Sequence, residues 1–221
     1  MKPGLSRELI ALRIVRELKD GMYVNLGFGL PAYIANFVPQ NIDVMLQAEN
    51  GVLGYGGVPT NEDEWDRELV NASAQPTSLR RGACFFHSAD SFAMIRGGHL
   101  DLVVLGAYQV SERGDIANYA RAGGEQFGVG GAMDLACGTK RVVAYMEHTT
   151  KSGEPRIVRE CTYPVTGRGV IDTIFTNLTV IEVTPEGLVL KELAPGVTVE
   201  QVQARTEPTL TISEDLREMR P

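Results

Sequence analysis

Residues 22–51 read MYVNLGFGLPAYIANFVPQNIDVMLQAENG, and this stretch decides the fold class. The segments 22–27 and 41–47 are short and mostly apolar, which is typical of strands, and the segment 31–38 between them is predicted to be a helix. A strand, a helix and a strand in this order form a βαβ unit. Such a unit requires a parallel sheet and a right-handed crossover.

The rest of the chain continues this alternation. Short runs rich in valine and isoleucine, typical of buried parallel strands, occur at 101–107, 141–146 and 178–183. Helices are predicted at 5–20, with Ser6 as N-cap and Gly21 as the C′ glycine, at 88–98, and from Thr198, where Gln201 completes a capping box. We find no internal repeat or linker, and therefore expect one α/β domain over residues 1–221.

Composition limits the class of partner. The chain carries a net charge of -7 and no long basic stretch, which argues against nucleic acid or an anionic membrane as the main partner. Charged residues interrupt the apolar N-terminal stretch, so we expect no secretory signal, and no apolar run approaches the roughly 20 residues of a membrane span. The three cysteines form no CxxC motif, and the simplest expectation is a reducing, cytoplasmic compartment.

Several familiar sites are not expected. Gly27, Gly29 and Ala32 follow a strand in the order G-x-G-x-x-A, but Pro31 is unusual inside a dinucleotide fingerprint, so we do not expect a nicotinamide cofactor. The three histidines share no metal-ligand spacing, and no metal site is expected. The chain has no G-x-S-x-G motif, so a serine hydrolase is not expected either.

Glu49 is the acid that needs an explanation. It ends a buried strand, where a carboxylate is costly without a partner or a function. Two hypotheses remain open from the local sequence: Glu49 caps the turn at Asn50 and Gly51, or it is a nucleophile at the carboxyl end of a parallel sheet. The glycine pair Gly130–Gly131 leaves a similar choice between a tight turn and close approach to a ligand.

Several segments together resemble one family. They are, in chain order, NLGFGLP at 25–31, ENGVLGYG at 49–56, SFAMIRGGH at 91–99, GVGGAMDL at 128–135, MEHTTKSG at 146–153 and TPEGLVLKELAPGVT at 184–198. Taken as a set, they resemble the β subunit of 3-oxoacid CoA-transferases, the family of acetoacetate and 3-oxoadipate CoA-transferases. The resemblance covers almost the whole chain, and the ENG stretch is its most specific part.

The resemblance implies both a fold and a site. The fold would be the three-layer α/β/α CoA-transferase architecture with a mostly parallel central sheet. Glu49 would be the nucleophile, Asn25 would lie near the oxyanion, and Gly130 and Gly131 would lie against the thioester. The other candidate residues for binding substrate or CoA are Gly27, Gly29, Asn50 and Gly51.

The resemblance also implies chemistry and a partner. CoA would be a substrate, no other cofactor would be needed, and a separate α subunit would complete the site in an α2β2 assembly. CoA would pass between acids through a glutamyl-CoA thioester by ping-pong chemistry. Two alternatives stay open: an acyl-CoA hydrolase on the same scaffold and a non-catalytic metabolite-binding relative.

Three departures from the family leave the acids undefined. Gly57 replaces the proline that usually follows the G-x-G of the ENG stretch. Ala48 replaces the serine that precedes the glutamate, which removes a hydroxyl close to the nucleophile. The segment 118–131, NYARAGGEQFGVGG, differs from the family's lysine-containing NW-x-x-P-G-K stretch. Acetoacetate, 3-oxoadipate, succinate and butyrate all remain candidate acids.

Overall fold

The computed structural model describes residues 4–61, 63, 65–121 and 128–221. Its elements, in chain order, are α1 (Arg7–Val15), β1 (Tyr23–Leu26), the 3-10 helix η1 (Pro31–Phe37), β2 (Met45–Ala48), β3 (Val52–Tyr55), β4 (Leu79–Phe85), α2 (Ser88–Arg96), β5 (Leu102–Gly106), β6 (Gln109–Ser111), β7 (Ile116–Ala117), α3 (Ala132–Gly138), β8 (Val142–Tyr145), β9 (Ile157–Val158), β10 (Thr173–Phe175), β11 (Thr179–Thr184), β12 (Gly187–Leu193), α4 (Val199–Gln203) and β13 (Leu210–Glu218).

The described strands form one large sheet and one small one. The large sheet has ten strands in the order β13-β12-β11-β10-β8-β5-β1-β2-β3-β4, and the small sheet joins β7, β6 and β9. The central strands β10, β8, β5, β1 and β2 run parallel to one another, as the βαβ pattern predicts. The expected parallel-rich α/β sheet is therefore confirmed.

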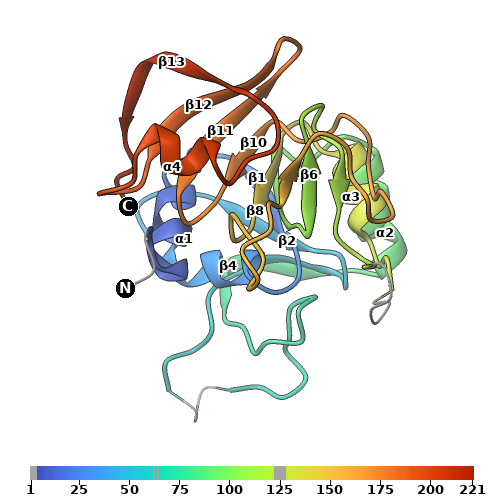
Figure 1. The fold of residues 1–221 in the computed structure, drawn as a ribbon. Helices are drawn as coiled ribbons and strands as arrows, with labels where there is room; N and C mark the ends of the chain where they lie inside the picture. Colours follow the sequence, from blue (N-terminus) through green and yellow to red (C-terminus); the bar gives the residue numbers. More distant parts are fainter. Residues whose placement is uncertain (1–3, 62, 64, 122–127) are drawn as a thin grey trace.

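Apolar residues alternate between the two faces of this sheet. On β5, Leu102 and Val104 belong to one buried cluster, whereas Val103 and Leu105 belong to the other. The first cluster packs under α1 and η1, and the second packs under α2, α3 and α4. Helices thus cover both faces, and Figure 1 shows α1 on one side of the sheet and α2 and α3 on the other. This is the expected three-layer arrangement.

Some sequence predictions are wrong in detail. Ser6 caps α1 as expected, but the helix ends at Val15, so Gly21 lies in the turn before β1 and is not its C′ glycine. The segment 31–38 forms a 3-10 helix instead of an α-helix, and the strand expected from residue 41 begins at Met45. The segment expected to be a parallel strand at 178–183 forms β11, which is antiparallel to both of its neighbours. Its composition did not indicate this, because a buried strand can be rich in valine in either direction.

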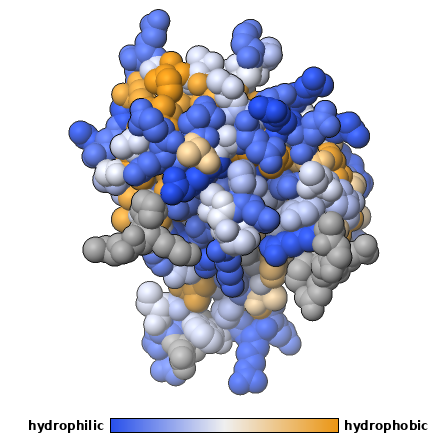
Figure 2. Space-filling model, viewed as in Figure 1, coloured by the Kyte–Doolittle hydropathy of each residue, from blue (hydrophilic) through white to orange (hydrophobic). Residues whose placement is uncertain are grey.

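The segment between β3 and β4 extends away from the sheet in Figure 1. Within it, the described residues of the charge-dense stretch 61–68 are exposed, and residues 62 and 64 lie outside the described part. β4 is the edge strand beside this segment, and most of its residues are exposed. The space-filling view in Figure 2 also shows this segment as mainly hydrophilic. None of the described helices is long and apolar enough to cross a membrane.

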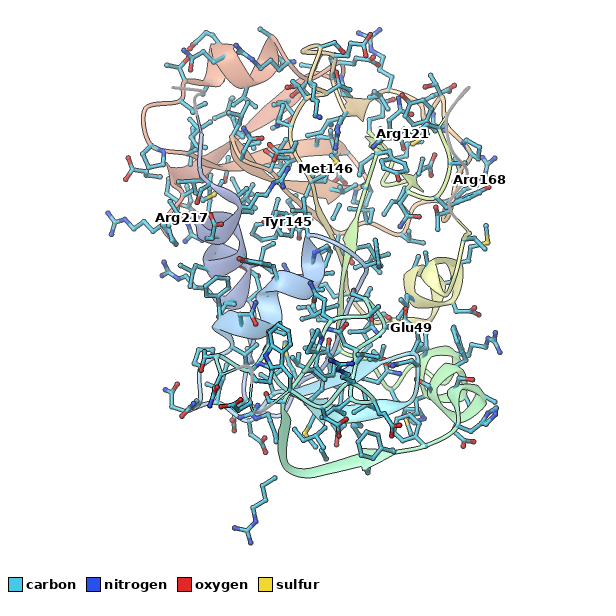
Figure 3. The ribbon with its side chains drawn as sticks, turned by 90° about the horizontal axis from the view of Figure 1, so that it is seen from below. Glu49, Arg121, Tyr145, Met146, Arg168 and Arg217 are labelled. Carbon is cyan, nitrogen blue, oxygen red and sulfur yellow. The ribbon has the colours of Figure 1, made fainter. Side chains whose placement is uncertain are left out.

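A buried ion network fastens the N-terminal helix to the far side of the sheet. Arg13 of α1 donates two hydrogen bonds to the carboxylate of Glu192, at 2.7 and 2.8 Å. Both side chains are buried, and Arg217 of β13 donates to the same carboxylate at 2.7 and 2.9 Å. Figure 3 labels Arg217 at the left of the molecule, near α1. The network therefore joins α1 to two C-terminal strands that are far from it in the sequence.

A bulge in β12 puts Glu192 on the correct face. Opposite β11, Leu190 pairs with Ile181 and Glu192 pairs with Val180, so Lys191 is the extra residue. Val180 belongs to the cluster under α1, whereas Ile181 belongs to the cluster on the other face. The extra residue turns the strand so that Glu192 faces Arg13.

His148 is a buried structural residue after β8. Its side chain is fully buried, and its two ring nitrogens lie 3.0 Å from the hydroxyls of Thr176 and Thr206. Burial, with a smaller contribution from the positive charge of Arg205, lowers the pKa of His148 to about 4. The imidazole is therefore neutral in the folded protein at neutral pH.

We expect the stability of the fold to fall between about pH 6.5 and pH 4. The unfolded chain binds a proton at His148 near its ordinary pKa of 6.5, whereas the folded chain binds it only near 4, so acid favours the unfolded state. This linkage is complete below pH 4 and amounts to about 3 kcal/mol. Urea unfolding at a series of pH values measures it. The slope in this range should be lost in His148→Gln and kept in a variant of the exposed His99, and an unchanged slope in His148→Gln would contradict the prediction.

Candidate active site

Strand alternation gathers three polar side chains on one face of the sheet. Asn25 of β1 pairs in register with Gln47 of β2, and both side chains are fully buried. Their neighbours Val24, Leu26 and Leu46 point to the opposite face, into the cluster under α1. Glu49 follows β2 two positions after Gln47 and lies on the same face as Gln47 and Asn25, toward α2 and α3.

A chain of hydrogen bonds orients Glu49. The Nδ2 group of Asn25 donates to Glu49 Oε2 at 3.1 Å and to Gln47 Oε1 at 2.7 Å. Gln47 Nε2 in turn donates to the hydroxyl of Ser91 on α2, and that hydroxyl donates to the carbonyl of Ala48 at 3.1 Å. Each bond fixes the orientation of the next amide, so the Asn25 amide nitrogen must face the Glu49 carboxylate.

One acceptor in this network has no donor. Asn25 Oδ1 is buried and has no hydrogen-bond partner among the residues that the structure describes. A buried acceptor without a donor is costly, and such groups are rare in folded proteins. The site therefore presents one polar atom that a substrate or a second chain could satisfy.

The glycine loop lies against the nucleophile candidate. Gly131 is buried at the start of α3, and a Cβ at this position would lie 3.7 Å from Glu49 Cγ and 2.9 Å from the ring of Phe92. Adjacent Gly130 has φ +53 and is exposed, with no atom near the place of a Cβ. The absence of a side chain at Gly131 leaves open the approach to Glu49.

The turn after Glu49 is built by Gly51 and Asn50. Gly51 has φ +112, and a Cβ there would overlap the carbonyl oxygen of Phe86, so only glycine fits. The exposed Asn50 donates from Nδ2 to the carbonyl of Val70 at 2.8 Å, which anchors the projecting segment. Both residues thus have clear structural contacts in the turn that presents Glu49.

The two glycines in the turn after β1, Gly27 and Gly29, differ in burial. Gly27 is buried, and a Cβ there would lie 3.1 Å from both Leu105 Cδ2 and the carbonyl oxygen of Val104, so it allows close packing on β5. Gly29 is exposed, has φ +85 and faces open space. Of the two, Gly29 is the one available to a ligand.

The negative charge of Glu49 affects the pKa of Tyr55 on β3. Its side chain is buried, and burial, followed by the negative charge of Glu49, raises the pKa of its hydroxyl well above the usual value. The phenol therefore remains neutral at any physiological pH. It adds no second negative charge beside the carboxylate.

Replacement of Gln47 tests the hydrogen-bond chain. We expect Gln47→Leu to fold, to lose about 1–3 kcal/mol of unfolding free energy, and to release the Asn25 amide from its fixed orientation. Any reaction at Glu49 that uses the Asn25 donor should then slow by at least about tenfold. Single-turnover kinetics of the reaction at Glu49, beside urea unfolding, measure both effects.

Thr179→Val is the matched control for this variant. Thr179 is also fully buried and hydrogen bonded, but it lies in β11 and contacts the backbone of Glu192. Its loss should lower stability without changing the reaction at Glu49. If the two variants slow that reaction equally, Gln47 serves only the fold.

Comparison with known proteins identifies the family. Residues 7–205 match the family model described as Coenzyme A transferase. The chain belongs to the coenzyme A transferase family. The family match spans most of the chain, including Asn25, Glu49 and the Gly130–Gly131 loop.

Two curated relatives of this family cover nearly the same length as the chain. Each is named as one of the subunits of its enzyme. The relative from the 3-oxoadipate CoA-transferase of Acinetobacter baylyi is 48% identical over 207 residues, which cover 93% of this chain and 95% of that protein. The relative from a probable succinyl-CoA:3-ketoacid coenzyme A transferase of Bacillus subtilis is 45% identical, with 96% and 97% covered. These matches support an enzyme of the CoA-transferase type.

A solved structure has the same fold. An acyl-CoA transferase apoenzyme from Escherichia coli superimposes with a TM-score of 0.78 at 22% identity and covers 99% of this chain. The present chain spans 44% of the length of that chain. The coenzyme A transferase fold expected from the sequence is therefore confirmed.

The structure adds Gln47 and Ser91 to the residues predicted from the sequence. Gln47 was interpreted as an ordinary strand residue, and Ser91 as part of a helix. The available signal was a glutamine two positions before Glu49 in an otherwise apolar strand, which places both side chains on one face. No sequence pattern indicates that Ser91 would meet it. Of the segment 118–131, residues 122–127 lie outside the described part of the chain.

Proposed function

We propose that this chain is the catalytic β subunit of a 3-oxoacid CoA-transferase in which Glu49 is the nucleophile. The observation that carries the proposal is the half-buried carboxylate of Glu49 at the carboxyl end of β2, held by the Asn25 amide and left accessible by Gly131. This carboxylate has no ion-pair partner among the described residues, so its charge is free for chemistry.

The first half-reaction forms an anhydride. A carboxylate oxygen of Glu49 attacks the carbonyl carbon of a donor acyl-CoA, the carbon–sulfur bond breaks, and CoA leaves as a thiolate. The thiolate then attacks the glutamyl carbonyl, the bond to the donor carboxylate breaks, and a glutamyl-CoA thioester remains. The acceptor acid reverses these steps. No net proton moves, so the site requires no general base.

The amide of Asn25 is positioned to stabilise the attack of the CoA thiolate on the glutamyl carbonyl. Its Nδ2 group already lies 3.1 Å from Glu49 Oε2, where negative charge develops when the thiolate adds to the glutamyl carbonyl. One preorganised donor of this kind is worth about 3 kcal/mol of barrier. The same hydrogen bond orients the carboxylate for the first attack. Asn25 is therefore both a positioning group and an oxyanion donor in this mechanism.

A partner chain fits the open side of the site. Phe28 after β1 is 77% exposed and Phe85 at the end of β4 is 64% exposed, and both lie close in sequence to the turns that form the site. Large exposed aromatic groups beside a reactive centre are typical of a contact surface. The two relatives are each named as one subunit of a larger enzyme, and we infer that an α subunit covers this region, in an α2β2 assembly, and excludes water.

The names of the relatives indicate the chemical class of the substrates. Their names specify 3-oxoadipate in one case and succinyl-CoA with a 3-keto acid in the other, so we assign a 3-oxo acid acceptor and an acyl-CoA such as succinyl-CoA or acetyl-CoA as donor. CoA is a substrate, and the mechanism requires no further cofactor. The reaction fits a cytoplasmic enzyme of ketone-body or aromatic-compound catabolism.

Trapping the thioester tests the proposal. The chain assembled with its partner is incubated with succinyl-CoA and no acceptor, then digested and analysed by mass spectrometry. The peptide that contains Glu49 should carry CoA, and adding acetoacetate or 3-oxoadipate should remove it and yield the new thioester. An unmodified peptide in active enzyme would exclude Glu49 as the nucleophile. Free CoA released at the same rate without acceptor would identify a hydrolase instead.

A further inference from the structure

The helix α2 contacts both sides of the site. Ser91 of α2 donates a hydrogen bond to the carbonyl of Ala48, the residue before Glu49, at 3.1 Å. The next residue, Phe92, directs the edge of its ring at Gly131 of the glycine loop. Figure 3 shows Glu49 next to α2 (green) and α3 (yellow). The position of the glycine loop relative to Glu49 is therefore set through α2.

The short helix α3 contacts α2 at both of its ends. At its C-terminal end, Gly138 lies against the backbone of α2, since a Cβ there would be 2.5 Å from the carbonyl oxygen of Ile95. At its N-terminal end, Gly131 lies against Phe92, with the ring atoms Cε1 and Cζ at 2.9 and 3.0 Å from the place of a Cβ. The first contact joins two backbones and has little room to adjust. The second contact therefore sets the tilt of α3 and the position of the glycine loop.

The ring of Phe92 leaves no room for a side chain at Gly131. The backbone of Gly131, with φ -86 and ψ 3, has a conformation that other residues also adopt, so it does not require glycine. Among the described residues, only atoms of Phe92 lie closer than 3.7 Å to the place of a Cβ. The Cγ of Glu49 lies at 3.7 Å, which is an ordinary van der Waals contact. The ring edge and the loop backbone are thus in direct contact.

Neighbouring side chains hold the ring of Phe92 in place. The ring is partly buried and packs against the apolar cluster on the α2 and α3 side of the sheet. Arg96, one helical turn later, covers it with 5.5 Å from the guanidinium carbon to the ring centroid. The Nε of Arg96 also donates to Asp134 of α3 at 2.6 Å. The ring is therefore a spacer of fixed length between α2 and the glycine loop.

The glycine loop has backbone donors to offer. No hydrogen bond among the described residues uses the N–H group of Gly130 or of Gly131. Free N–H groups stabilise an oxyanion only at hydrogen-bond distance from it. A misplacement of about 1 Å can cost about a hundredfold in rate. The length of the spacer therefore bears on any reaction at Glu49 that uses these donors.

We propose that Phe92 is a positioning residue whose ring sets the separation between the glycine loop and the carboxylate of Glu49. Phe92 acts through Gly131 and is not itself a group that reacts. Its effect on the reaction rests on the proposed function, whereas its effect on the separation does not. A shorter or a longer side chain should move the loop in opposite directions and slow the reaction in both cases.

Two substitutions of Phe92 test the proposal. Phe92→Leu shortens the spacer, and Phe92→Tyr lengthens it, because the added oxygen is bonded to Cζ, which faces Gly131. In the assembled enzyme, single-turnover formation of the thioester at Glu49 from succinyl-CoA should slow by about tenfold or more in both variants. The succinyl-CoA concentration that gives half of the maximal rate should change little. Phe92→Tyr keeps the packed ring and should melt close to the wild type.

A double variant tests whether Phe92 and Gly131 act as a pair. Gly131→Ala alone should slow the reaction, because its methyl group must displace either the ring or the loop. When Gly131→Ala is combined with Phe92→Leu, the methyl group fills space that the shorter side chain leaves. The loop should then return toward its place, and the rate should exceed that of either single variant. Two neighbours that act through one contact show this kind of non-additivity.

Leu188→Ala is the control for lost packing. Leu188 is fully buried in the same apolar cluster but lies on β12, which is separated from β2 by five strands. It should lower the melting temperature without slowing the reaction. A Phe92→Tyr enzyme at the wild-type rate, or a double variant as slow as the product of the two single effects, would overturn the proposal. If Phe92→Leu does not fold, Phe92→Tyr alone decides between these outcomes.

A separate measurement distinguishes failure of the proposed function. If the wild-type enzyme forms no thioester at Glu49, the nucleophile assignment is wrong. Crystal structures of the wild type, Phe92→Leu and Phe92→Tyr then test the spacer by itself, through the distance from Gly131 Cα to Glu49 Cγ. Opposite changes of this distance in the two variants would support the proposal, and the same distance in all three proteins would exclude it.

Discussion

Glu49→Gln should abolish CoA transfer while leaving the fold intact. The amide has nearly the shape of the carboxylate, and its oxygen can still accept the hydrogen bond from Asn25, so the turn and its neighbours should not move. An amide is a poor nucleophile, however, so the variant could not form the anhydride of the proposed mechanism. Removal of a nucleophile that acts with its neighbours as a unit costs at least about 10⁴-fold in rate.

The measurement is the steady-state rate of transfer, beside thermal melting and mass analysis of the Glu49 peptide. The variant should melt within a few degrees of the wild type and carry no CoA adduct. Glu182→Gln is the matched control, because it makes the same change at an exposed glutamate of β11 that pairs with Lys191. It should retain most of the chemistry. Transfer by Glu49→Gln at more than about a hundredth of the wild-type rate would show that another group is the nucleophile.

Glu192→Ala should cause the largest loss of stability. Its carboxylate is 2% exposed and accepts hydrogen bonds from Arg13 and Arg217. Although burial alone would raise the pKa of Glu192, these two guanidinium groups hold it below its ordinary value, so the carboxylate is charged. Its removal breaks the buried pair with Arg13 and leaves Glu17, at 2.8 Å, as the remaining carboxylate beside that guanidinium. We therefore expect a loss of about 3 kcal/mol, at the lower end of the range for breaking a buried ion pair.

Urea unfolding measures this loss of stability. Two further variants test its cause. Glu182 pairs with Lys191 at 3.6 Å on the exposed side of the same strands, so Glu182→Ala should change stability by less than about 1 kcal/mol. In the double variant of Arg13→Met with Glu192→Leu, both charges are absent, and much of the stability should return. A small effect of Glu192→Ala alone would mean that Glu17 and water are sufficient to stabilise the charge of Arg13.

The central part of the fold could be predicted from the sequence because its signals are local. Valine-rich runs separated by helical segments indicate parallel strands, and β1, β5 and β8 lie within one residue of where those runs predict them. The direction of β11 could not be predicted in this way, because a buried strand has the same composition whichever way it runs. The 3-10 form of the segment after Pro31 was missed for a similar reason, since short apolar spacing fits both helix types.

The candidate site was predictable only in part. Glu49 was identified as a candidate because burying a carboxylate at the end of a strand costs free energy. Asn25 and the glycine loop were identified by the resemblance to the family. Gln47 and Ser91 were missed because their roles depend on a contact between β2 and α2 that no local pattern encodes. The same holds for Arg13 and Glu192, which are far apart in the sequence and meet through a bulge.

Alternation along β2 fixes the position of Glu49, the proposed nucleophile, relative to the core residues of the same strand. Leu46 and Ala48 fill the core under α1, while Gln47 and Glu49 serve the opposite face. Deletion of one residue within the strand would carry the carboxylate into the core and an aliphatic side chain into the site. The length of β2 is thus constrained both by the core and by the site. Changes of substrate specificity are therefore expected in the loops more often than in the strand that precedes Glu49.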